Sequence, residues 1–159
     1  MPKLTPHMKR VLKQQPVILV ASSDGWGRPN ISPRGALKIV DDDKLVWADL
    51  ASVKTRANLL SDPRVAVAAV DPRTYEAYQF KGRAELLGEG PLFDEICRLL
   101  NHGRDGYQPM ELWFEKAARE VVAALQRTGR DFVCPACAVV LHIDEIWNLA
   151  PGHEGEVWR

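Results

Sequence analysis

The sequence predicts an α+β fold in which short strands form a closed or partly open antiparallel barrel. Three observations support this prediction: β-type runs of strand length alternate with turn clusters, one short helix follows the third run, and a helical pair is confined to one stretch before the last run. A parallel sheet would need a crossover connection between every pair of strands. With 159 residues, 46% of them hydrophobic, we expect a single domain over residues 1–159.

The chain is expected to begin with a short helix and a hairpin. Thr5 followed by Pro6 has the form of a helix N-cap with proline at the first helical position, and Pro16 ends the helix. Three apolar residues recur between them at helical spacing: Met8, Val11 and Leu12. Residues 17–21 form a β-branched run, and the turn cluster at 22–25 contains an Asp-Gly pair that suits a hairpin.

Two further strands follow this turn. We expect the second strand from Pro29 to Val40, with a kink or bulge at Pro33 and Gly35 where backbone groups leave the ladder. The third strand is expected from Lys44 to Asp49. Alternation divides its residues between two faces, with Leu45 and Trp47 on one and Val46 and Ala48 on the other.

A short helix and two strands come next. Ser52 can cap a helix that runs through Leu60. Its expected inward face consists of Val53, Ala57 and Leu60. The apolar run at 65–70 predicts a strand buried on both faces, and residues 75–87 predict a longer one.

The second half of the chain contains the helical pair and the last strand. From Pro91 the apolar residues recur at helical spacing, first as Leu92, Ile96 and Leu99, then as Leu112, Ala117, Val121, Ala124 and Leu125. This insertion, residues 90–129, could cover a binding site or pack on the barrel, and its regular apolar stripe favours packing. Residues 134–143 return to strand composition, with Ile146-Trp147 near the strand's end.

Composition argues against several classes of function. Lys+Arg 21 and Asp+Glu 21 give a formal net charge of zero, so we expect neither nucleic acid nor a membrane surface as a partner. The first ten residues lack the apolar segment of a secretory signal, and no apolar run is long enough to span a bilayer. Three cysteines do not make a disulfide framework. These features predict a cytoplasmic protein.

The segment from Trp47 to Leu59 runs from a strand through a tight loop into a helix, a geometry that can hold an anion. The hydroxyls of Ser52 and Thr55, the Lys54 ammonium and the first backbone N–H groups of the helix can converge on one phosphate. Arg56 adds a further positive charge. Taken alone, the segment is explained better as a surface helix with solvated cations.

The interpretation changes when this segment is combined with residues 29–35 and 78–85. The ordered series resembles the FMN-binding split barrels of the pyridoxamine 5'-phosphate oxidase-like superfamily, over about residues 17–87 and the last strand near 139–149. The resemblance implies an antiparallel split β-barrel of about six strands and a homodimer with FMN at its interface. It also implies an oxidoreductase or an electron carrier.

The resemblance assigns roles to particular residues. Asn30, Ser32, Pro33 and Arg34 would lie along the flavin ring and ribityl chain, and Trp47, Ala48 and Asp49 would flank the cofactor. Lys54 matches the phosphate-binding lysine, with Ser52 and Thr55 in support. Gln79 lies near the position from which a strand glutamine contacts the flavin edge.

The sequence also departs from the oxidase pattern. Val53 precedes Lys54 where two adjacent basic residues are common, so part of the charge at the phosphate must come from Arg34, Arg56 or a partner chain. The C-terminal substrate-binding Trp and Arg of the oxidase have no convincing counterpart, because Trp147 is followed by Asn-Leu. Oxidation of vitamin B6 is therefore not expected.

Two alternatives to an FMN protein remain at this stage. Members of the superfamily also bind deazaflavin F420 or haem. A second alternative is a non-catalytic sensor that binds flavin or a metal through Cys134 and Cys137, whose spacing lets two sulfurs face one ion or each other. The spacing is more often that of two partly buried thiols at a strand edge.

Overall fold

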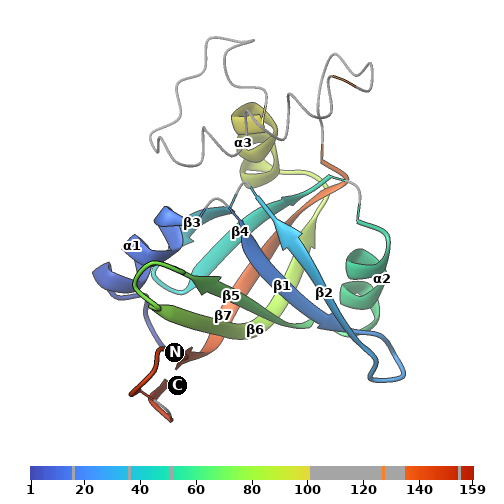
Figure 1. Ribbon diagram of the computed structural model, residues 1–159. Helices are drawn as coiled ribbons and strands as arrows, with labels where there is room; N and C mark the ends of the chain where they lie inside the picture. Colours follow the sequence, from blue (N-terminus) through green and yellow to red (C-terminus); the bar gives the residue numbers. More distant parts are fainter. Residues whose placement is uncertain (16, 36, 51, 101–126, 128–134, 154) are drawn as a thin grey trace.

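The computed structural model of the protein describes residues 1–15, 17–35, 37–50, 52–100, 127, 135–153 and 155–159. The elements, in chain order, are α1 (Pro6–Gln14), β1 (Ile18–Ser23), β2 (Pro29–Arg34), β3 (Leu37–Asp41), β4 (Lys44–Asp49), α2 (Lys54–Ser61), β5 (Arg64–Val70), β6 (Ala77–Leu87), α3 (Pro91–Leu100), β7 (Cys137–Asn148) and β8 (Val157–Trp158). Figure 1 shows the strands curling around a common interior.

The strands pair in the order β2-β1-β5-β6-β7-β4-β3, and β8 pairs with β7. Every pair is antiparallel. β2 and β3 occupy the two ends of this order although only residues 35 and 36 separate them in the chain. The sheet must therefore curl until its two edges come close, which gives a split barrel, as the sequence predicted.

The predicted second strand, Pro29 to Val40, is divided into β2 and β3 in the structure. β2 pairs with β1 and β3 pairs with β4, so the two halves belong to opposite edges of the sheet. The break falls after Arg34, beside the Pro33 and Gly35 that predicted a kink. Proline cannot donate to a ladder and glycine bends easily, so the chain leaves one edge here.

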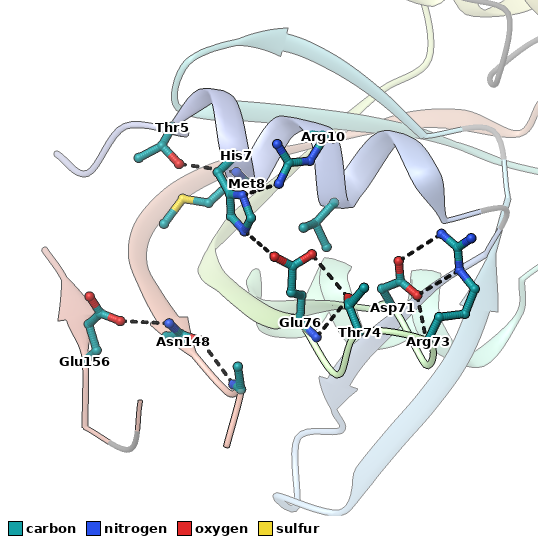
Figure 2. Close-up of polar contacts among 12 residues, drawn as sticks. Thr5, His7, Met8, Arg10, Asp71, Arg73, Thr74, Glu76, Asn148 and Glu156 are labelled. Atoms are coloured by element: carbon teal, nitrogen blue, oxygen red, sulfur yellow. Dashed lines mark hydrogen bonds and ion pairs between the residues drawn. The ribbon is translucent and has the colours of Figure 1, made fainter. Parts of the chain in front are cut away.

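Helix α1 agrees with its prediction. Thr5 Oγ1 accepts the Met8 N–H at 3.2 Å, and proline occupies the first turn. Met8, Val11 and Leu12 are all buried in the larger core cluster. The helix is also attached to the turn between β5 and β6, because His7 Nε2 lies 2.8 Å from Glu76 Oε1 (Figure 2).

Strand β4 is buried on both faces and separates two core clusters. Leu45 and Trp47 point into the larger cluster inside the barrel. Val46 and Ala48 belong to a second cluster with Ile96, Leu99 and Leu100 of α3. The predicted alternation and the predicted helix at Pro91 are both confirmed. The second predicted helix and Cys134 lie outside the described residues.

Two predicted faces were wrong. Helix α2 begins at Lys54 without a side-chain cap, so Ser52 does not cap it. It buries Thr55, Asn58 and Leu59, whereas Val53 is 77% and Leu60 72% exposed.

Strand β5 buries only alternate residues, because its outer face is partly open to solvent. Apolar spacing predicts a helix or a strand, but it does not show what covers each apolar residue.

Among the residues that the structure describes, no helix combines the length and the apolar composition needed to cross a membrane.

Gly82 lies where β6 and β7 approach most closely. The register of this pair shifts between Lys81 and Gly82. A Cβ atom at Gly82 would lie 1.8 Å from the backbone oxygen of His142, so no side chain fits unless the backbone moves. Glycine is thus required by the close approach of two strands.

We predict that Gly82→Ala lowers the free energy of unfolding by about 3 kcal/mol, the upper range for overpacking. Urea denaturation measures this change. Gly88→Ala is the matched control, because a Cβ there meets nothing within 4 Å, and its effect should stay within about 0.5 kcal/mol. Equal denaturation midpoints for the two variants would show that the close approach is not a constraint.

Candidate functional site

Three side chains of β2 converge on one hydroxyl group of α2. Asn30 Nδ2 lies 3.2 Å, Ser32 Oγ 2.9 Å and Arg34 Nη2 3.1 Å from Thr55 Oγ1. Residues two apart share a face of a strand, so all three point inward toward α2. The Thr55 hydroxyl has one donor and two acceptor positions. It can accept from Asn30 and Arg34 and donate to Ser32, which uses its full capacity.

The same group of hydrogen bonds extends to β1. Ser22 Oγ accepts from Asn58 Nδ2 at 3.1 Å and from Asn30 Nδ2 at 3.4 Å. Thr55 and Asn58 are three residues apart and therefore lie on one face of α2. We call Ser22, Asn30, Ser32, Arg34, Thr55 and Asn58 the Thr55 cluster. It fixes α2 against β1 and β2, as seen on the right of Figure 1.

Asp49 shapes the loop that leads into α2. Its side chain lies at the end of β4 and is only 2% exposed. Oδ1 accepts the backbone N–H of Ser52 at 3.0 Å, while Oδ2 lies 4.0 Å from Arg56 Nη1. The carboxylate therefore stabilises the turn and holds a guanidinium near the start of α2.

Two buried polar atoms near this loop have no partner within the described part of the chain. These atoms are Nε of Arg34 and Oγ of Ser52; a third such atom, Nε1 of Trp47, lies in the barrel core. Burial lowers the pKa of Arg34, and the charge of Asp49 opposes that shift. A buried donor without an acceptor is costly, because desolvation is not compensated. Each of these groups could donate a hydrogen bond to an oxygen of an anionic ligand.

The first turn of α2 adds to this preference for an anion. No side chain caps its N-terminus, so backbone N–H groups remain available. Their dipoles favour negative charge. Lys54 is exposed at the first helical residue. The residues present therefore fit a phosphate group.

The other predicted site residues lie in different surroundings. The side chain of Trp47 is fully buried in the barrel core, and that of Ala48 is 5% exposed against the α3 cluster. Pro33 points to the outer face, opposite Leu19. Gln79 lies on β6, paired with Ala68 and Trp147, and takes no part in the Thr55 cluster. Within one chain, the site thus consists of residues from β2, the end of β4 and α2.

Sequence analysis missed Ser22 and Asn58. Asn58 follows Thr55 by three residues, and this uncharged polar i, i+3 pair places two hydrogen-bonding side chains on one face of the helix, a signal that could have identified it. Ser22 was assigned to a turn, but it is the last inward-facing residue of β1. No local pattern predicts that its hydroxyl meets α2.

Cys137 lies on β7, paired with Asp49 at the end of β4. Its Sγ is 3.9 Å from Asp49 Oδ2, and the side chain is buried. Burial, reinforced by the charge of Asp49, raises the pKa of the thiol to about 11. The thiol therefore stays protonated near neutral pH and is a poor nucleophile or metal ligand. Within the described ranges, no three His, Cys, Asp or Glu side chains gather as a metal site.

We predict that Thr55→Val lowers the free energy of unfolding by about 1–3 kcal/mol, because it leaves buried donors without their acceptor. Thr55→Ser keeps the hydroxyl and loses one methyl group, so its cost should be about 0.8 kcal/mol. Urea denaturation of both variants measures the difference. A serine variant that loses as much stability as the valine variant would show that the methyl group, and not the hydroxyl, holds α2.

Solved structures support the fold assignment. HupZ of Group A Streptococcus has a TM-score of 0.69 at 23% identity, with 94% of this chain and 97% of that chain covered. A protein from Clostridium acetobutylicum related to general stress protein 26 has a TM-score of 0.67 at 12% identity, with 96% and 92% covered. An FMN-binding protein from Syntrophomonas wolfei has a TM-score of 0.56 at 17% identity, with 88% and 81% covered. These similarities establish a common fold.

Sequence comparison goes further than fold. An uncharacterised protein of Methanocaldococcus jannaschii is 30% identical over 152 residues, which cover 94% of this chain and 83% of that protein. The family model described as pyridoxamine 5'-phosphate oxidase matches residues 4–122. This match includes β1 to β6 and the whole Thr55 cluster. The chain belongs to the pyridoxamine 5'-phosphate oxidase family.

Proposed function

We propose that the protein binds FMN and uses it in an oxidation–reduction reaction. The observation that carries this proposal is the pair of buried, unpartnered donors, Arg34 Nε and Ser52 Oγ, beside the uncapped start of α2. The family membership makes a flavin phosphate the natural anion for such a site. The FMN-binding neighbour from Syntrophomonas wolfei shares the fold.

In this proposal the phosphate is held at the start of α2. Lys54 supplies a charge, Ser52 a hydroxyl and the first helical turn its backbone N–H groups. Arg34 and Arg56 supply the second positive charge, because this chain has the uncharged Val53 where a basic residue is common in the family. Thr55 has a different role from the predicted one, because its hydroxyl is already fully hydrogen-bonded. It holds β2 and α2 at the spacing that the phosphate site needs.

The flavin ring and ribityl chain would lie along β2 and the end of β4. Asn30 and Ser32 offer polar side chains there, and Asp49 closes the loop. The side chains of Trp47 and Ala48 are buried, so they would not contact the cofactor directly. Gln79 lies on the outer face of the sheet, where it would meet a flavin bound mainly by the partner copy.

A bound flavin supplies the redox chemistry by accepting and donating electrons. The chain's own contribution is to bind and orient it. The guanidinium of Arg34 is half-buried, so its charge is poorly screened and stabilises negative charge that develops nearby. No side chain needs to act as an acid or base for this role.

We also propose a homodimer, formed through the outer face of β2, β1 and β5. Ile31 is 67% and Leu19 45% exposed on this face, beside the small residues Ala66 and Ala68 of β5. An apolar surface of this kind is typical of an interface. Dimers are common in this family, which supports the proposal. We also propose the cytoplasm as the location.

We predict that the purified protein is yellow and releases FMN, identified by mass, in proportion to chains. Lys54→Ala should weaken FMN binding by about 10- to 150-fold, the range for loss of a charged hydrogen bond. Quenching of flavin fluorescence during titration of the apoprotein measures this. Lys3→Ala, a lysine on the N-terminal segment before α1, should bind as the original chain does.

The spectrum also separates the alternatives. A Soret band would indicate haem, and a deazaflavin mass would indicate F420. A colourless protein that takes up none of the three cofactors would contradict the proposed function.

For the dimer, we predict that Ile31→Glu shifts the sedimentation coefficient to that of a monomer, because a charge would be buried in the interface. Val40→Glu is the control: Val40 is 41% exposed on β3, which pairs with β4 and with none of the strands of the proposed interface. A variant Ile31→Glu that remains dimeric would exclude this face as the contact.

A further inference from the structure

The outer face of the sheet contains a shallow cavity of about 500 Å³. Strands β1, β5, β6 and β7 line it, and its floor includes the small residues Ala21, Ala66 and Gly82. Three cationic side chains stand around it: Arg64, Lys81 and Arg83. Cavities of this size hold small organic ligands. The Thr55 cluster lies on the opposite face of β1, so this cavity is separate from the proposed flavin phosphate site.

Arg64 and Arg83 stand directly opposite each other on β5 and β6. Like charges in this position repel and destabilise a sheet. Asp62 relieves part of this repulsion, because its carboxylate lies 2.6 Å from Arg64 Nη2. The hydrogen bonds from Arg64 hold the pKa of Asp62 at about 2. Arg83 has no carboxylate within ion-pair distance among the residues that the structure describes.

Lys81 shares its counter-ion with another cation. Glu145 Oε1 lies 3.4 Å from Lys81 Nζ, and Glu145 Oε2 lies 2.9 Å from Arg159 Nε. The Lys81 ammonium also lies 4.9 Å from the centre of the Trp147 ring. Asp144 is the remaining carboxylate on the wall. Counting Arg159, four cations stand against the three carboxylates of Asp62, Asp144 and Glu145, which leaves an excess of one positive charge.

A second Asp-Pro-Arg tripeptide shows that the local motif alone does not make a site. Residues 62–64 and 71–73 share this sequence, and in each the aspartate accepts from the backbone and side chain of the arginine. Figure 2 shows Arg73 folded back onto Asp71. Arg73 lies in the turn after the last β5–β6 pair, Val70 with Ala77, so the ladder places no second cation opposite it. Only Arg64 faces another arginine across a cavity.

We propose that this cavity binds a small anion, with a phosphate or carboxylate group held between Arg64 and Arg83. An oxygen anion there would relieve the repulsion between the two guanidinium groups and give Arg83 a partner. Ala21 and Ala66 leave a flat apolar floor for the body of the ligand. The cavity adjoins the outer face of β1 and β5 proposed above for the dimer. Of the Thr55 cluster, only Ser22 is among its lining residues.

The test follows the arginine Nε–H signals by NMR while inorganic pyrophosphate, and separately citrate, is added at constant ionic strength. We expect saturable shifts of the Arg64 and Arg83 signals and no saturable shift of Arg73. Arg83→Gln should weaken the binding seen at Arg64 by about tenfold or more, the loss of a charged hydrogen bond. Arg73→Gln should leave it unchanged.

The two probes distinguish a phosphate site from a carboxylate site by their relative affinities. Lys54→Ala should leave the shifts of Arg64 and Arg83 intact even where it abolishes binding of FMN, which keeps this test apart from that of the proposed function. Parallel, non-saturating shifts of Arg64, Arg83 and Arg73 would overturn the proposal, as would an Arg83→Gln variant that binds pyrophosphate and citrate as tightly as the original chain.

Discussion

The arrangement of the protein depends on one topological constraint. β2 and β3 are consecutive in the chain, yet they form the two opposite edges of the sheet. The Cα atoms of Arg34 and Leu37, three residue steps apart, can be at most about 11 Å apart, so the edges must approach each other and the sheet must curl. In the curled sheet, the inward face of β2 points toward the end of β4 and the start of α2. The candidate site forms at this junction.

The inward face of β2 is polar at a place where a barrel usually has apolar side chains. Asn30, Ser32 and Arg34 alternate along it, and each would carry a desolvation cost without a partner. The hydroxyl of Thr55 meets part of that requirement for all three. Among the described residues, neither Nε of Arg34 nor Oγ of Ser52 has a hydrogen-bond partner. The hydrogen bonds of the Thr55 cluster thus leave unsatisfied donors only where a phosphate is proposed to bind. Unsatisfied donors beside a satisfied network are expected of a binding site rather than of a core.

Sequence patterns predicted the elements better than their surroundings. The alternation in β4 and the caps of α1 are local properties, and both were correct. The division of the predicted Pro29–Val40 strand between two edges depends on which strands pair, which no local pattern records. For α2, the apolar residues Val53 and Leu60 were expected to face inward because burial is the usual fate of such residues. The polar Thr55 and Asn58 lie inward instead, because they form hydrogen bonds with polar side chains of β1 and β2.

The same limit applies to the site. Lys54 and Ser52 were identified because a strand, a loop and a helix start are visible in sequence order. Ser22 could not be identified in this way, since its contact with Asn58 joins residues 36 positions apart. The like-charged pair Arg64 and Arg83 likewise depends on the register between β5 and β6.

Successive side chains of β1 point to opposite faces of the sheet, so this strand contributes both to the Thr55 cluster and to the cavity on the outer face. Ser22 points inward to the Thr55 cluster, whereas its neighbour Ala21 points outward to the cavity beside Arg64 and Arg83. A shift of one residue in the pairing of β1 would exchange these faces and break both arrangements. The antiparallel ladders of β1 with β2 and with β5 fix that register from both sides. Preservation of both surfaces therefore requires the β1 register to be maintained, and an insertion within this strand should damage them together.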